Sequence, residues 1–599
     1  MKRTRSCLGF VGRLALYLVW GWLTLALVWP LLARWLDNSP TPRPGLTNYL
    51  IVAPLALEKS AHAWADYRRA TGYAVYIVFV SPTEATVPNI RQHIQRVYTE
   101  SGRPYPFYVL LLGHAQVWDE GSDSYLPAAS VPLDLPQELI NEIGSDHIAS
   151  DDAYALENDV LLPIAFGRVP AWTEAEALRV LARTQAYEAT PPTGLNRTQV
   201  ELIASESLFG PVFDQAIEKL VIFFVEEHLP TYYRWHMLYG HPDSPYAYPA
   251  PEFPGEVARR LDQGAVLATY IGHGSSDWLG PALGDDGWEG PVFTASDVSL
   301  VNDAQASLVT MIACSAGEYD QSRSLAEELL LKPGGAVATY AASRLTLPAA
   351  NTILGKDLFR VLLAGQARTA GEWIRLAESN YKNPGSDEAL SLWLLTRAIP
   401  PAYELAIWGN ESETPPLDAE LVYGLQQHAY NLFGDPALAL ALPRPELKLR
   451  PNWAWLPLGG RLAFSGENDS LVNGQVVTVT LYTRQSNLLP RAGPAGDLAT
   501  RYQNANDKTV AQAGVSVNAD GKFGGEFSLS TGLPSGRYIL EAVAVNANTT
   551  LVGAHVVYIG WPPVGELLGS AGFWWLVFSV GLVELYRRRT KGPLTVHPG

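Results

Sequence analysis

The alternation of apolar runs with amphipathic stretches constrains the fold of this chain more than any other feature of its sequence. Residues 49–54 (YLIVAP), 73–80 and 107–112 are predicted to be buried strands. Between them, residues 59–71 and 87–100 carry apolar side chains at helical spacing. Strands that alternate with helices are typical of a parallel sheet covered by helices. The sequence therefore predicts an α/β fold.

A second series of the same kind follows further along the chain. Strands are predicted at 199–204, 233–238, 265–271, 308–312 and 335–341, and helices at 212–228, 255–263 and 324–331. We interpret the two series as two α/β subdomains in tandem, at residues 49–195 and 196–445.

The pattern changes after residue 445. Short β-rich runs at 475–482, 523–529, 537–546 and 550–559 are separated by turns rich in Gly, Asn, Asp and Pro. This pattern is typical of an all-β sandwich, which we expect at residues 446–560. Its role is left open between a spacer, a substrate-binding module and a partner that stabilises the fold.

Both ends of the 599-residue chain carry a long apolar segment flanked by basic residues. Residues 14–33 are uncharged over about the 20 positions that a membrane-spanning helix needs, and residues 567–583 form a shorter candidate. We therefore predict membrane anchors at 1–36 and 561–599, with a linker at 37–48. The basic clusters would place both termini in the cytoplasm and the rest outside.

Other interpretations of these segments stay open. The first could be a cleaved signal peptide, although its apolar region is long for one. The second could be a buried core helix or a bacterial sorting signal that is later processed. Two anchors around a large outer region fit a protein of the bacterial cell envelope.

Charge and cysteine content exclude two broad classes of function. The formal net charge is −17, and the clearest basic clusters lie at the chain ends, so a nucleic-acid partner is not expected. Of the two cysteines, Cys7 lies before the first apolar segment and Cys314 lies in the predicted outer region. A disulfide framework is therefore excluded, and Cys314 is either a small buried residue or a nucleophile.

Two predicted strands each end at a potentially catalytic residue. The strand over residues 265–271 leads to His273 and Gly274, and the strand over 308–312 leads to Cys314. Ligands of open α/β sheets bind at the carboxyl ends of strands. An imidazole close to a thiol can take its proton, and backbone N–H groups of Gly274 and Cys314 could stabilise an oxyanion. Each residue alone could be structural, but together they predict a Cys–His catalytic pair.

The segments around both residues resemble the gingipain-like family of cysteine peptidases, in the clan of caspases and legumain. YIGHGSSDWLG (270–280) and MIACSAGEYD (311–320) are similar to its histidine and cysteine motifs. Five further segments resemble the family in the same order: YVLLLGH (108–114), SDDAY (150–154), PIAFGRVPAWTEAEALRVLARTQAYE (163–188), KPGGAVATYAASR (332–344) and NLFGDPAL (431–438). The resemblance covers residues 49–445, about two thirds of the chain.

The resemblance implies a caspase-like fold of two α/β subdomains followed by an immunoglobulin-like module. It implies that His273 and Cys314 are the catalytic dyad and that Gly274 contributes to the oxyanion hole. Where the family has an acidic residue ahead of an FIGR-like stretch, this chain has Pro163. The group that orients the imidazole therefore stays open between a third side chain and a backbone carbonyl.

The resemblance also suggests positions for a substrate pocket and a metal site. Glu174 and Glu176 are the nearest counterparts of the acidic pocket residue, although acids in a first helical turn are commonly structural. Trp278 and Trp288 could wall the pocket. Asp151, Asp152 and Asp159 could bind a structural Ca²⁺ ion, with a spacing unlike that of an EF-hand loop. The reaction itself requires no cofactor.

We therefore expect a membrane-anchored cysteine endopeptidase that acts on a protein or peptide substrate. Two alternatives stay open. A transpeptidase of the same fold would let an amine replace water, and a catalytically inactive surface protein would use the fold for binding or adhesion. A probe that alkylates reactive cysteines would separate the last from the others, because a merely buried thiol is inert.

Overall fold

The computed structural model describes most of the region between the two apolar ends of the chain. The described residues are 47–132, 140, 145–157, 160–206, 218, 221–222, 225–226, 229–283, 289–304, 307–382, 426–484, 497–546 and 548–560. Both predicted anchors, at 1–36 and 561–599, lie outside these residues, as does most of the predicted helix at 212–228.

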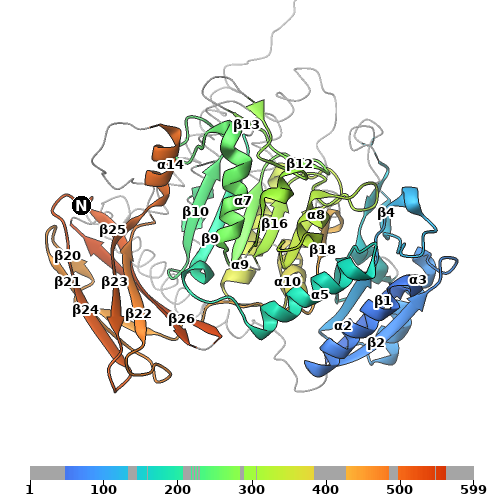
Figure 1. Cartoon of the computed structure of the whole chain (residues 1–599), viewed down its shortest axis with the longest axis horizontal. Helices are drawn as coiled ribbons and strands as arrows, with labels where there is room; N and C mark the ends of the chain where they lie inside the picture. The colour runs from blue at the N-terminus through green and yellow to red at the C-terminus, as the bar shows by residue number, and fades with distance from the viewer. Residues whose placement is uncertain are drawn as a thin grey trace, which may run out of the picture. The chain divides into compact units, whose positions relative to one another are not determined.

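A ten-stranded sheet forms the centre of the fold (Figure 1). In spatial order its strands are β10 (Arg234–Tyr239), β9 (Gln199–Ala204), β11 (Leu267–Ile271), β16 (Leu308–Ile312), β17 (Ala338–Ala342), β18 (Tyr430–Phe433), β8 (Ile164–Val169), β3 (Phe107–Leu112), β1 (Thr47–Pro54) and β2 (Tyr73–Val80). Every neighbouring pair is parallel except β17 and β18. The prediction of a mixed α/β fold with a mainly parallel sheet is confirmed.

Strand β18 joins the two series of strands into one sheet. It runs antiparallel to β17 and parallel to β8, which it meets through the pair Phe433 and Arg168. The predicted boundary at residues 195 and 196 therefore falls between strands of a continuous sheet. Strands β3, β8, β16 and β17 are buried along their whole length, as the apolar composition of central parallel strands requires.

Helices cover both faces of the sheet. Trp64, Val180, Leu261 and Leu329 come from helices α2 (Glu58–Ala70), α5 (Glu174–Ala189), α7 (Phe253–Gln263) and α8 (Leu325–Leu331) and share one core. Helix α3 (Val87–Glu100) packs into a second core, and α9 (Pro348–Leu363) and α10 (Ala370–Lys382) pack into a third. Local signals begin two of these helices, since Thr173 caps α5 and Ser324 with Glu327 forms a capping box on α8.

Residues 447–559 form two sheets around a separate core. One sheet contains β19 (Lys448–Pro451), β21 (Arg461–Glu467) and β24 (Lys522–Ser528). The other contains β20 (Trp455–Leu456), β26 (Thr549–Ile559), β25 (Gly536–Asn546), β22 (Val476–Tyr482) and β23 (Thr509–Ser516). Leu462 and Phe464 of the first sheet pack into the same core as Val479 and Leu540 of the second. This region is called the β-region below.

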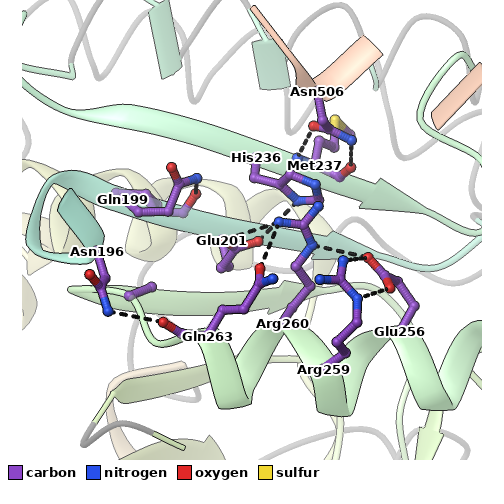
Figure 2. Close-up of polar contacts among 12 residues, drawn as sticks. Asn196, Gln199, Glu201, His236, Met237, Glu256, Arg259, Arg260, Gln263 and Asn506 are labelled. Carbon is purple, nitrogen blue, oxygen red and sulfur yellow. Dashed lines mark hydrogen bonds and ion pairs between the residues drawn. The ribbon is translucent and has the colours of Figure 1, made fainter. Parts of the chain in front are cut away.

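Helix α14 (Leu498–Asn506) of the β-region contacts the edge strand β10 through Asn506, whose side chain lies beside Met237 in Figure 2. The side-chain amide of Asn506 accepts a hydrogen bond from the N–H of Met237 at 2.9 Å and donates one to its carbonyl at 2.9 Å. Tyr502 donates to Glu256 of α7 at 2.6 Å. Hydrogen-bonding groups of an edge strand are therefore satisfied by a side chain of the β-region.

A buried pair of ionisable residues lies beneath this contact. Glu201 of β9 and His236 of β10 are register partners, and their Oε2 and Nδ1 atoms lie 3.0 Å apart (Figure 2). Burial raises the pKa of Glu201 to about 8, against an opposing effect of Arg260. Burial also lowers the pKa of His236 well below its usual value, with a further contribution from Arg260 and Lys508. Burial therefore favours the uncharged form of both side chains.

The carboxyl group of Glu201 should make the free energy of unfolding depend on pH between pH 5 and 8. We expect the Glu201→Gln variant to lack this pH dependence. Folding raises the pKa of this acid, so its contribution to stability is fully present at pH values below the pKa in the unfolded state. That contribution is lost as the pH rises through the pKa in the folded state. The free energy of unfolding of the native protein should fall across this range by roughly 3–4 kcal/mol more than that of the variant. Urea unfolding at several pH values measures the difference.

The exposed Glu100→Gln change on α3 is the matched control and should leave the slope unaltered. The charged groups that face Glu201 are Arg259, Arg260 and Glu256 of α7, and none of them is changed in either variant. Equal slopes for Glu201→Gln and the native protein would show that Glu201 does not titrate as its burial demands.

Candidate active site

The carboxyl ends of four adjacent parallel strands meet at one edge of the sheet. Strands β9, β11, β16 and β17 are neighbours, and their registers pair Ala204 with Ile271, Ile271 with Ile312, and Met311 with Ala341. The residues that follow these strands therefore lie side by side along this edge. They include Ser205 and Glu206, His273, Cys314, and the segment from Arg344 to Thr346.

The backbone of His273 is held by two side chains. Its N–H donates to Oγ of Ser205 at 3.1 Å, and Tyr270 donates its phenol hydrogen to the carbonyl of His273. Burial raises the pKa of Tyr270, which keeps the phenol protonated and able to donate. A Cβ atom at Gly272 would lie 2.0 Å from Ser205 Oγ, so only glycine permits this approach.

The segment after His273 turns back as a short hairpin that touches the cysteine segment. Within it, Ser275 N–H donates to Trp278 at 2.8 Å and Gly280 N–H donates to His273 at 3.2 Å. Neither bond uses the N–H of Gly274. A Cβ atom at Gly274 would lie 3.0 Å from the carbonyl oxygen of Cys314, so the two segments are in direct contact. The structure thus brings the residues around His273 and Cys314 together.

Cys314 is a free, half-buried thiol at a sharp turn. Ser315 adopts a φ of 53°, in the left-handed region that non-glycine residues seldom occupy. The N–H of Ser315 donates to the carbonyl of Arg344 at 3.1 Å, which ties this turn to the end of β17. The strained residue thus follows directly after the predicted nucleophile, as is common at functional sites.

Thr346 contacts the sulfur of Cys314 through its N–H, its carbonyl oxygen and its hydroxyl. Its N–H donates to Sγ of Cys314 at 3.4 Å, and the thiol lies 3.6 Å from the Thr346 carbonyl oxygen and 3.7 Å from its Oγ1. Thr346 could not be predicted from the sequence, because no local pattern marks a loop residue that reaches the site through tertiary structure.

A buried carboxylate–imidazole pair occupies the same edge of the sheet. Glu206 follows β9, and its Oε2 lies 2.7 Å from Nδ1 of His241, which follows β10. Glu206 is also tied through its N–H to the carbonyl of Pro281 at 2.9 Å, in the segment that extends from His273. Neither residue was among the predicted site residues, although the position of Ser205 and Glu206 directly after a predicted strand is a signal that could have indicated Glu206.

Trp278 lines a hollow beside the histidine hairpin. The hollow has a volume of about 580 Å³, and its walls are Asp277, Trp278, Pro281, Glu289, Gly290, Pro291, Thr294, Ala295 and Ser296. The side chain of Trp278 is 37% exposed, which is high for so large an apolar group. The structure therefore places this predicted pocket residue at a cavity, whereas Trp288 lies outside the described residues.

The two glutamates predicted for the pocket have partners in the fold instead. The carboxylate of Glu174 accepts hydrogen bonds from the N–H groups of Lys59 and Ser60, at 3.0 and 2.8 Å, and so caps helix α2. Glu176 accepts from Trp172 N–H at 2.9 Å and pairs with Arg323 at 3.1 Å. These contacts give both carboxylates structural partners at helix ends and in an ion pair, and their role in a pocket stays a prediction.

The aspartates predicted to bind Ca²⁺ are also engaged. Asp151 forms a buried two-bond pair with Arg168, at 2.8 and 2.7 Å, and accepts from Tyr319 at 3.0 Å. Asp152 lies 3.4 Å from Arg375. Among the residues that the structure describes, no group of three acidic, histidine or cysteine side chains could hold a metal ion, and Asp159 lies outside them.

Within the described ranges, no helix is both long enough and apolar enough to cross a membrane. The two apolar segments predicted as anchors are not among those residues.

Comparisons with known proteins define the class of this chain as a cysteine-type peptidase, which acts on protein or peptide substrates. The chain belongs to peptidase family C25, the gingipain family, whose model matches residues 43–441. The resemblance noted in the sequence is thereby confirmed.

A search of solved structures matches the chain to the Arg specific cysteine proteinase gingipain R, among others. It is 17% identical, the match covers 87% of this chain and 99% of that one, and the TM-score is 0.46. A structure described as a protease is 14% identical over 86% of this chain and 97% of its own, with a TM-score of 0.47. No curated protein matches the chain in sequence.

Proposed function

We propose that the chain is an endopeptidase that cleaves peptide bonds with a Cys314–His273 dyad. The observation that carries this proposal is the contact between the two segments at the carboxyl ends of β11 and β16, where Gly274 packs against the carbonyl of Cys314. Both proposed reactive residues follow adjacent parallel strands, and membership of a cysteine peptidase family supplies the reaction class.

In the first half of the proposed reaction, His273 takes the thiol proton and the sulfur of Cys314 attacks the peptide carbonyl carbon. The carbonyl oxygen becomes an oxyanion, which the N–H groups of Gly274 and Cys314 stabilise. His273 then gives its proton to the amine nitrogen as the carbon–nitrogen bond breaks. The acyl group stays on the sulfur as a thioester.

In the second half, His273 takes a proton from water, and the resulting hydroxide attacks the thioester. The carbon–sulfur bond breaks, His273 returns its proton to the sulfur, and the carboxylic acid product leaves and loses a proton to the solvent. No metal or organic cofactor takes part in these steps. The side chain next to the cleaved bond is proposed to enter the hollow beside Trp278, where Asp277 and Glu289 disfavour acidic side chains.

Labelling with a peptidyl acyloxymethyl ketone tests the dyad. The native chain should be labelled on Cys314 and should cleave a fluorogenic peptide library, whereas Cys314→Ala should do neither while keeping its native circular dichroism spectrum. A native protein that stays unlabelled by probes with several side chains would overturn the proposal. Cleavage in the presence of an added amine distinguishes hydrolysis from transpeptidation, since only the latter yields an amide product.

Membrane anchoring at both ends and an immunoglobulin-like module are part of the same proposal. The long uncharged segment at 14–33, the apolar segment at 567–583 and their basic flanks support anchors at both ends and a catalytic region outside the bacterial cytoplasm. The two-sheet β-region supports an immunoglobulin-like module. A membrane-impermeant form of the probe should label Cys314 on intact cells, and labelling only after lysis would contradict this topology.

A further inference from the structure

We propose that Thr346, oriented by Asn351, is a positioning residue that donates hydrogen bonds to the thiolate of Cys314 and so makes the thiol ionise at lower pH. This inference rests on the proposed function, because it assigns a supporting role within the same site. Its evidence is a set of contacts between the sulfur and the segment that follows β17.

The backbone N–H of Thr346 is the first of the two donors. It points at Sγ of Cys314 from 3.4 Å, a normal length for a hydrogen bond to sulfur. Such a donor stabilises the negatively charged thiolate more than the neutral thiol, because hydrogen bonds to ionised groups are stronger than those between neutral groups. Thr346 is buried, so water competes little for this contact.

The second donor depends on the orientation of the Asn351 amide. Its Oδ1 accepts from the phenol of Tyr430 at 2.8 Å and from Nε2 of Gln426. Two donors on one side identify that atom as the oxygen, so Nδ2 faces Thr346. Burial raises the pKa of Tyr430, which keeps its phenol protonated and able to donate.

The second donor is the Thr346 hydroxyl. Nδ2 of Asn351 donates to its Oγ1 at 2.8 Å, so the oxygen acts as an acceptor there, and its own hydrogen can point to Sγ of Cys314 or to the phenol oxygen of Tyr430, with which the Thr346 side chain also forms a hydrogen bond. Sγ of Cys314 lies 3.7 Å from Oγ1 and either atom could donate. Once the thiol has lost its proton only the hydroxyl can donate. The Asn351 amide thus prepares Thr346 as a second donor to the thiolate.

Other ionisable groups around the sulfur come from each neighbouring strand. His273 follows β11, Tyr270 lies on β11, and Tyr430 lies on β18. The guanidinium of Arg344, after β17, is paired with Asp320 at 2.7 Å. Burial raises the pKa of both tyrosines, so they stay neutral across the range where a thiol and an imidazole titrate. A pH profile of thiol reactivity therefore reports on Cys314 and His273.

The experiment measures the rate of iodoacetamide alkylation against pH in the full-length chain carrying Cys7→Ser, so that Cys314 is its remaining thiol. Thr346→Val removes the hydroxyl and keeps the shape and the N–H. We expect the alkylation midpoint of Thr346→Val to move up by about one pH unit, as the loss of a charge-assisted hydrogen bond implies. Thr346→Ser should keep the native midpoint.

Two further variants complete the design. Asn351→Leu should move the midpoint in the same direction, and it tests the proposal even if Thr346→Val fails to fold. Thr310→Val, which removes a buried hydroxyl that bonds Thr269 within the sheet, is the matched control and should leave the midpoint unchanged. An unchanged midpoint in folded Thr346→Val or Asn351→Leu would overturn the inference.

Failure of the inference differs from failure of the proposed function. Alkylation needs no peptide substrate, so the role of Thr346 can be wrong in an enzyme that cleaves peptides and binds the ketone probe normally. Conversely, an inactive chain whose midpoint responds to Thr346→Val would keep the contact and refute the peptidase dyad.

Discussion

Replacing His273 with alanine should lower kcat for peptide hydrolysis by about 10³-fold, the middle of the range for loss of a general acid–base group. In the proposed mechanism the imidazole moves a proton in both halves of the reaction, so its loss affects acylation and deacylation. Binding of the peptide does not involve the imidazole, and KM should change much less than kcat. Steady-state kinetics on a peptide that the native chain cleaves measure both constants.

The matched control is His62→Ala, since His62 lies on the exposed side of helix α2 and pairs with Glu58. Its kinetics should equal those of the native chain. A His273→Ala variant that keeps more than a tenth of native kcat would show that another group moves the proton. The buried Glu206–His241 pair at the same sheet edge is then the group to change next.

Replacing Asp435 with asparagine should lower the free energy of unfolding by about 3–5 kcal/mol, because it removes one partner from a buried ionic network. Asp435 is fully buried between the two series of strands. Its carboxylate accepts from Tyr49 at 2.9 Å, from Trp64 at 2.6 Å, and from two nitrogens of Arg68 at 2.9 and 2.7 Å. An amide nitrogen in place of a carboxylate oxygen would face these donors.

Urea unfolding at neutral pH, followed by tryptophan fluorescence, measures this loss. Asp66→Asn on the same helix as Arg68 removes an exposed i,i+3 pair with Arg69 and should cost less than about 0.5 kcal/mol. A loss below about 1 kcal/mol for Asp435→Asn would mean that Glu188, the other carboxylate on Arg68, carries most of the ion pairing.

Much of the candidate active-site edge could be predicted from the sequence, because the relevant signals are local. An apolar run that stops at His273, and another that stops at Cys314, mark the ends of buried strands. Parallel topology then requires both ends to share an edge. The glycine after the histidine is an equally local signal, and in the structure a Cβ atom at Gly274 would lie 3.0 Å from the carbonyl oxygen of Cys314.

The rest of the fold and of the candidate site depends on contacts between residues far apart in the sequence. The periodicity of apolar residues does not predict such contacts. Thr346 contacts Cys314 from 32 positions away, and Asp435 reaches Tyr49 across 386 positions. Strand β18 has only four residues, too few for an alternation pattern to reveal that it joins the two series of strands. The partners of Glu174 and Asp151 in the structure, Ser60 and Arg168, are likewise brought to them by the fold and could not be predicted from the sequence.

The amide of Asn506 has a consequence for how this protein can associate with other chains. It occupies the backbone groups of Met237 on β10 that an incoming strand would need, much as an additional strand would. Among the described strands of the central sheet, the other outermost one is β2. A polypeptide that extends the sheet by strand addition would therefore have to enter beside residues 73–80, at the opposite end of the strand order from the β-region.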